Sequence, residues 1–112
     1  MKARIYHNPR CSKSRAALAL LEARGVDVEI VDYLSVPPSR ATLAALLDKL
    51  RVPPLDLIRG DDREIAKRAA AAPDEILDLL AAHPRELQRP IVEVGRRAVI
   101  GRPPERVLEL LE

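Results

Sequence analysis

Residues 3–32, ARIYHNPRCSKSRAALALLEARGVDVEIVD, predict a strand, a helix and a second strand in immediate succession. The first strand is residues 3–6, which are followed by an Asn-Pro turn. Residues 12–24 then carry alanine and leucine at helical spacing, and Gly25 ends the helix. Residues 26–32 are rich in β-branched side chains, as strands are. A helix that connects two consecutive strands implies that the strands pair in parallel, with a right-handed crossover.

The next part of the chain predicts helices that are interrupted by prolines. Ser39 follows two prolines and is a suitable N-cap for a helix with leucines on one face from Leu43 to Leu50. The other predicted helical segments are a turn or short helix at Pro54–Arg59, a helix at about 63–71 capped by Asp61 or Asp62, and a helix at Asp74–Ala82.

The C-terminal part predicts a hairpin and a last helix. Ile91–Val94 and Arg97–Ile100 flank Gly95-Arg96, which suits a two-residue turn. The last helix begins at Pro103 or Pro104. This order of elements predicts an α/β fold of thioredoxin-like layout, a four-stranded mixed sheet flanked by helices with an inserted helical segment. The length of 112 residues predicts one domain, residues 1–112.

Composition argues against several classes of function. The net charge is only +2 and two tyrosines are the only aromatic residues, so we expect no nucleic-acid partner. No apolar stretch approaches the length of a membrane span, so we expect no membrane partner. A single cysteine forms no internal disulfide, which favours the reducing cytoplasm. The small size and the lack of an obvious apolar patch favour a monomer.

The single cysteine, Cys11, lies in the sequence His-Asn-Pro-Arg-Cys-Ser-Lys-Ser-Arg, and the first 21 residues carry five cations and no acid. Nearby positive charge and the N-terminal end of the predicted helix both favour a thiolate. The alternative is a small buried cysteine that acts only as an apolar side chain. The residue three positions later is Ser14 rather than a second cysteine, so a disulfide partner must come from another molecule.

Three arginines occupy positions that suit anion binding. Arg59 lies before a glycine, Arg89 precedes a proline at the start of a strand, and Arg102 precedes the last helix. Guanidinium groups present rigid forks of donors to tetrahedral oxyanions. The alternative for each is a solvated surface side chain. X-Pro bonds such as the one after Arg89 can be cis.

Two further residues are candidates to support the thiolate. His7, as an imidazolium, would help lower the pKa of the thiol, or it is simply a polar residue at the end of a strand. Ser14 would donate a hydrogen bond to the thiolate or satisfy backbone groups in the first helical turn. One cysteine and two distant histidines give no metal-ligand spacing, so we expect no metal.

The nonapeptide around Cys11 resembles the signature of the glutaredoxin-dependent arsenate reductases. The resemblance extends over the whole chain through later blocks in the same order, namely Tyr33-Leu34, Arg89-Pro90-Ile91-Val92 and Ile100-Gly101-Arg102-Pro103-Pro104-Glu105. It implies that Cys11 is the nucleophile and that Arg59, Arg89 and Arg102 bind arsenate. It also implies glutathione as co-substrate, glutaredoxin as partner and no bound cofactor.

Two other functions remain open from the sequence. Relatives of this fold include redox-responsive transcriptional regulators that bind RNA polymerase, but these typically carry Cys-x-x-Cys, and Ser14 argues against that function. A glutathione-dependent thiol oxidoreductase acting on another substrate would use the same thiolate and the same cations.

Overall fold

The computed structural model describes residues 1–59 and 72–112. The helix predicted at about 63–71, with Asp61 or Asp62 as its cap, lies outside the described residues. The strands are β1 (Lys2–Tyr6), β2 (Asp27–Val31), β3 (Ile91–Val94) and β4 (Arg97–Ile100). The α-helices are α1 (Ser12–Ala23), α2 (Arg40–Leu50) and α4 (Pro73–Ala82), and the 3₁₀ helices are η1 (Pro54–Leu57), η3 (Pro84–Glu86) and η4 (Pro104–Leu111).

The four strands form one mixed sheet in the order β2-β1-β3-β4. β1 and β2 pair in parallel, which confirms the prediction from residues 3–32, while β1–β3 and β3–β4 are antiparallel. Ile5 lies at the centre, opposite Ile30 on one side and Val92 on the other. This is the predicted α/β architecture of a four-stranded mixed sheet with flanking helices.

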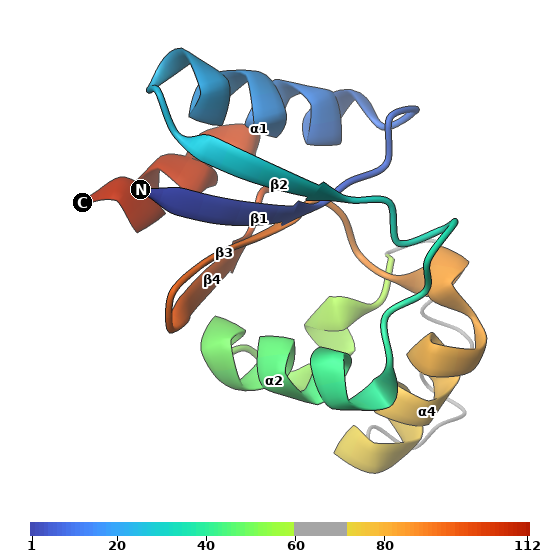
Figure 1. Cartoon of the computed structure of the whole chain (residues 1–112). Coiled ribbons are helices and arrows are strands. Elements are labelled where there is room, and N and C mark those ends of the chain that lie inside the picture. The colour runs from blue at the N-terminus through green and yellow to red at the C-terminus, as the bar shows by residue number, and fades with distance from the viewer. Residues whose placement is uncertain (60–71) are drawn as a thin grey trace.

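Helices cover both faces of the sheet because side chains alternate along each strand. Ile5 and Val92 belong to the core under α1 and η4, whereas Tyr6 and Ile91 belong to the core shared with α2 and α4. Figure 1 shows α1 and the C-terminal helix on one side of the sheet, and α2 with α4 on the other. Leucine, isoleucine, valine and alanine supply most of these cores, since the chain has no phenylalanine or tryptophan.

Several predicted boundaries are found in the structure. The hydroxyl of Ser39 accepts a hydrogen bond from the backbone N–H of Thr42 and caps α2. α1 ends at Ala23, and Gly25 adopts a φ of +73°, which a side chain would oppose. The last helix begins at Pro104 and has the 3₁₀ form. None of the described helices is both long and apolar enough to cross a membrane.

The strand order brings three distant loops to one edge of the sheet. Tyr6, the last residue of β1, lies opposite Ile91, the first residue of β3, and Ile91 in turn lies opposite Ile100, the last residue of β4. The loop that follows Tyr6 contains Cys11, the loop before Ile91 contains Arg89, and the residues after Ile100 include Arg102. These three side chains therefore start from neighbouring strand ends.

Candidate active site

Cys11 occupies the N-cap position of α1 at the end of a tight loop. Its backbone is extended, with φ −91° and ψ 120°, and its N–H donates to the Asn8 carbonyl at 3.0 Å. The Asn8 side chain shapes the same loop, because Oδ1 accepts a hydrogen bond of 2.9 Å from the backbone N–H of Arg10. An N-cap side chain lies beside the unpaired N–H groups of the first helical turn, where negative charge is favoured.

The environment of Cys11 lowers the pKa of its thiol. Partial burial of the sulfur raises the pKa, but hydrogen bonds from the backbone N–H groups of Ser14 and Lys13 lower it, and so do the hydrogen bond and the charge of Arg89. The net shift is downward, which increases the thiolate fraction near neutral pH. Cys11 is partly exposed, so the alternative of a sealed apolar cysteine is wrong.

Arg102 and Arg89 lie at the sulfur. Arg102 Nη2 is 3.9 Å from Cys11 Sγ, and its Nε donates a hydrogen bond of 2.8 Å to the Arg89 carbonyl. Arg89 Nε is buried and has no hydrogen-bond partner among the described residues. Because an unsatisfied buried donor is costly, this guanidinium is suited to a bound anion.

The two Arg-Pro loops pack against each other and against α1. Both the Arg89–Pro90 and Arg102–Pro103 bonds are cis, and the N–H of Gly101 donates to the Pro90 carbonyl at 2.9 Å. A Cβ added at Gly101 would lie 2.8 Å from Pro90 Cγ and 3.6 Å from Ala17 Cβ. Glycine at position 101 thus permits the close approach that places Arg102 beside the helix start, a role that the sequence reasoning did not assign.

Arg59 lines a hollow of about 420 Å³ together with Asn8, Pro9 and Arg10 of the loop. Its position is fixed by an isolated bridge between Ile58 and Leu87 and by a hydrogen bond of 2.9 Å from its own N–H to the Glu86 carbonyl. Of the three predicted arginines, Arg89 and Arg102 therefore lie at the sulfur. Arg59 lies in the adjoining hollow with Asn8 and other residues of the loop.

His7 and Ser14 support the loop in a different way from the one expected. Nδ1 of His7 and Oγ of Ser14 share a hydrogen bond of 2.6 Å, and Oγ also accepts one of 3.1 Å from the backbone N–H of Asn8. The hydroxyl of Ser14 thus bonds within the loop. Its backbone N–H, and not its hydroxyl, donates to the Cys11 sulfur, so the first expectation for Ser14 is wrong. Burial lowers the pKa of His7, with Asp32 opposing this shift and Arg15 adding to it, so the neutral imidazole is favoured over the expected imidazolium.

Tyr33 is a residue of the site that the sequence marks only through the family resemblance. It follows β2 and is 1% exposed. Burial raises the pKa of its hydroxyl, while the charge of Arg89, a hydrogen bond with Asn8 and the charge of Arg59 lower it; the charge of Cys11 raises it. Its hydroxyl therefore lies among the groups that form the site. The available signal was a lone aromatic residue directly after a strand.

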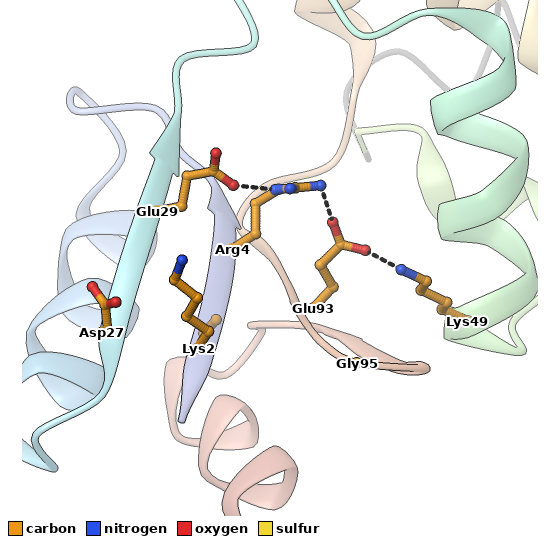
Figure 2. A pocket seen from close by; sticks show the side chains of 8 residues that line it. Lys2, Arg4, Asp27, Glu29, Lys49, Glu93 and Gly95 are labelled. Carbon is orange, nitrogen blue, oxygen red and sulfur yellow. Dashed lines mark hydrogen bonds and ion pairs between the residues drawn. The ribbon is translucent and has the colours of Figure 1, made fainter.

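A second hollow, of about 470 Å³, lies over the sheet on the side of α2, and its lining includes Arg4 of β1, Glu29 of β2 and Lys49 of α2. Figure 2 shows its central side chains in a row, with Arg4 between Glu29 and Glu93, and Glu93 also bound to Lys49. This hollow contains no cysteine. Within residues 1–59 and 72–112, no group of three or more His, Cys, Asp or Glu side chains is arranged to hold a metal.

Comparisons with known proteins identify relatives along the whole chain. The sequence model of the ArsC family matches residues 6–110. An arsenate reductase of Neisseria meningitidis is 41% identical over 113 residues, which cover 96% of this chain and 97% of the relative. Among solved structures, an arsenate reductase from Vibrio cholerae superposes with a TM-score of 0.90 at 36% identity, covering 98% of each chain. A putative arsenate reductase from Yersinia pestis gives 0.86 at 42% identity, covering 96% of this chain and 98% of that one.

Proposed function

This chain belongs to the ArsC family, and we propose that it reduces arsenate to arsenite through the thiolate of Cys11. One observation carries the proposal. The thiol of Cys11 is partly exposed, its pKa is lowered in part by the charge of Arg89, and its Sγ lies 3.9 Å from Arg102 Nη2. A nucleophile held beside guanidinium donors suits an electrophile that is itself an oxyanion.

Arsenate binds between these two arginines and the start of α1. The guanidinium groups pair with its oxygens, and the first N–H groups of the helix add partial positive charge. Arg89 Nε, buried and unpartnered among the described residues, gains an acceptor when the anion is present. Arg59 extends the positive field from the adjoining hollow.

The reaction proceeds by exchange of oxygen for sulfur on arsenic, followed by a two-electron transfer. The Cys11 thiolate attacks arsenic, a sulfur–arsenic bond forms, and one oxygen leaves as water after protonation. A glutathione thiol then displaces a second oxygen as water. The two sulfurs join as a disulfide, each giving up one electron, and arsenic leaves in the +3 state and takes up one water to form arsenite.

The oxidised cysteine must be reset from outside the chain, because the sequence contains only one cysteine. A thiolate of glutaredoxin attacks the glutathione sulfur of the mixed disulfide, a new disulfide forms on glutaredoxin, and the Cys11 thiolate leaves. Glutathione is thus the co-substrate and glutaredoxin the partner, with no bound cofactor. A monomer in the reducing cytoplasm is sufficient for this cycle.

The proposal is tested by measuring arsenite produced by the purified protein with arsenate, glutathione and glutaredoxin. Cys11→Ser should lower turnover at least about 1000-fold, because it removes the nucleophile. Arg96→Ala, a change at the exposed turn of the β3–β4 hairpin, serves as a control that keeps full activity. Arsenite formation that persists in Cys11→Ser, or its absence in the wild type with every thiol tried, would rule the proposal out.

A further inference from the structure

We propose that the hollow beside Cys11 is the binding site for the thiol co-substrate, and that it selects a small thiol carrying two carboxylates and one ammonium, as glutathione does. This inference rests on the proposed reduction of arsenate by an external thiol. It assigns the place where that thiol is held, separately from the place where arsenate is held.

The charge of the hollow is the first argument. Among the residues that the structure describes, its lining includes three arginines, Arg10, Arg59 and Arg85, and one carboxylate, Asp32. The carboxylate already accepts hydrogen bonds from Ser35 Oγ at 2.9 Å and from the backbone N–H groups of Leu34 and Ser35 at 3.2 Å. A surplus of guanidinium groups over carboxylates is the complement of a ligand with two carboxylates and one ammonium.

Two of these arginines are available to a ligand. Arg10 and Arg85 are exposed, and neither guanidinium forms an ion pair with any residue in the described part of the chain. The backbone of each residue is held in place, since the N–H of Arg10 donates to Asn8 Oδ1 and the carbonyl of Arg85 accepts a bond from Arg59 Nη1 at 3.4 Å. The backbones of both residues are therefore held, and their guanidinium charges form no ion pair with the described residues.

The position of the hollow is the second argument. Asn8, Pro9 and Arg10 form part of its wall, and the next residue along the chain is Cys11. Tyr33 lines the hollow and also lies within electrostatic range of the Cys11 sulfur. Arg89 and Arg102 are not among the lining residues. Cys11 does not line the hollow either, so a thiol held here by its carboxylates must extend past Asn8–Arg10 to reach the sulfur, by another path than an anion bound by those two arginines.

Size is consistent with this assignment. A hollow of about 420 Å³ falls within the range of small-molecule sites, roughly 300–1,000 Å³. It is far larger than a tetrahedral oxyanion requires. The additional space suits a ligand of peptide size whose central thiol points towards Cys11.

The test measures disulfide exchange at Cys11 and needs no arsenate. The Cys11 thiolate attacks one sulfur of glutathione disulfide, a Cys11–glutathione bond forms, and one glutathione thiolate leaves, with no net oxidation. The rate is followed by mass spectrometry and compared with the rate for 2-hydroxyethyl disulfide, which has no charge. The ratio of the two rates cancels any change in the reactivity of Cys11 itself.

Arg85→Glu and Arg10→Glu should each lower this ratio by about tenfold, since each replaces an attractive contact by a repulsive one. Arg96→Glu makes the same change of net charge at the exposed hairpin turn and should leave the ratio unchanged. A ratio that is unaffected in both arginine variants, or lowered equally in Arg96→Glu, would overturn the assignment. An effect of both variants confined to the reaction with glutaredoxin would also overturn it and give the hollow to a protein partner.

The two proposals fail separately. A wild-type protein that reduces no arsenate, yet shows the expected loss of ratio in Arg85→Glu, contradicts the proposed function and supports the thiol site. Arsenate reduction that depends on Cys11, together with an unchanged ratio, gives the opposite result.

Discussion

The hollow over the sheet and the site around Cys11 both gather cations and use them differently. Around the hollow of Figure 2, three cations face three carboxylates, and Glu93 alone accepts bonds from Arg4, Tyr6 and Lys49. At the Cys11 site, Arg89 and Arg102 lie at the sulfur, and Arg10 and Arg85 form no ion pair with the described residues. Charges that are paired hold structure together, whereas charges left without partners attract a ligand.

The row of paired charges in Figure 2 joins three strands to a helix. Glu93 extends from β3, its side chain is 9% exposed, and its partners come from β1 and α2. Arg4 continues the row to Glu29 on β2. Burial of Glu93 makes its pairs depend on one another, because the loss of a partner leaves a desolvated carboxylate.

The largest effect is expected at the Cys11 site. Arg89→Ala and Arg102→Ala should each lower kcat/KM for arsenate by about 100-fold or more, because each removes a guanidinium that faces the oxyanion. The midpoint of urea unfolding should change little in either variant. Kinetics with purified protein check the first expectation, and unfolding curves check the second. Normal arsenate kinetics in both variants would remove these arginines from the site.

A smaller effect is expected at Glu93, and it concerns stability rather than activity. Glu93→Gln should lower the free energy of unfolding by about 1–2 kcal/mol, because Lys49 and Arg4 lose a buried charged partner. The folded variant should keep the activity of the wild type. Urea unfolding followed by circular dichroism measures the loss.

Glu29→Gln is the matched control for that variant, since Glu29 also pairs with Arg4 but its side chain is 59% exposed. Exposed pairs contribute little, so the cost should stay below about 1 kcal/mol. Equal costs for the two substitutions would show that burial does not distinguish the two glutamates.

The smallest effect is expected in the pH dependence of Cys11. The pKa of this thiol is lowered, so the thiolate persists as the pH falls below the ordinary midpoint of about 8.5, and alkylation slows only at lower pH. Iodoacetamide kinetics against pH measure the midpoint directly. Arg89→Ala should move it upward, because it removes a hydrogen bond and a charge that favour the thiolate. A midpoint at or above the ordinary value in the wild type would contradict the activation of Cys11.

The sequence around Cys11 predicted much of the site because the relevant contacts are local. A cysteine directly before a helix lies at the N-cap, and the N–H groups that lower its pKa belong to residues two and three positions later. The absence of a second cysteine at Ser14 is equally a local fact. The strand-helix-strand start followed from the same short-range periodicity, since each element is specified by its own residues.

The tertiary structure alone decided which distant residues join Cys11. Arg102 reaches the sulfur from 91 positions away, and it does so because β4 lies beside β3 and because Gly101 allows the close packing of the two loops. Tyr33 likewise comes to the site from the end of β2, where it lies near Asn8 and Arg89. Short-range spacing fixes a helix start and a thiolate, whereas the order of strands fixes the partners, because contacts across a sheet join residues that the chain keeps far apart.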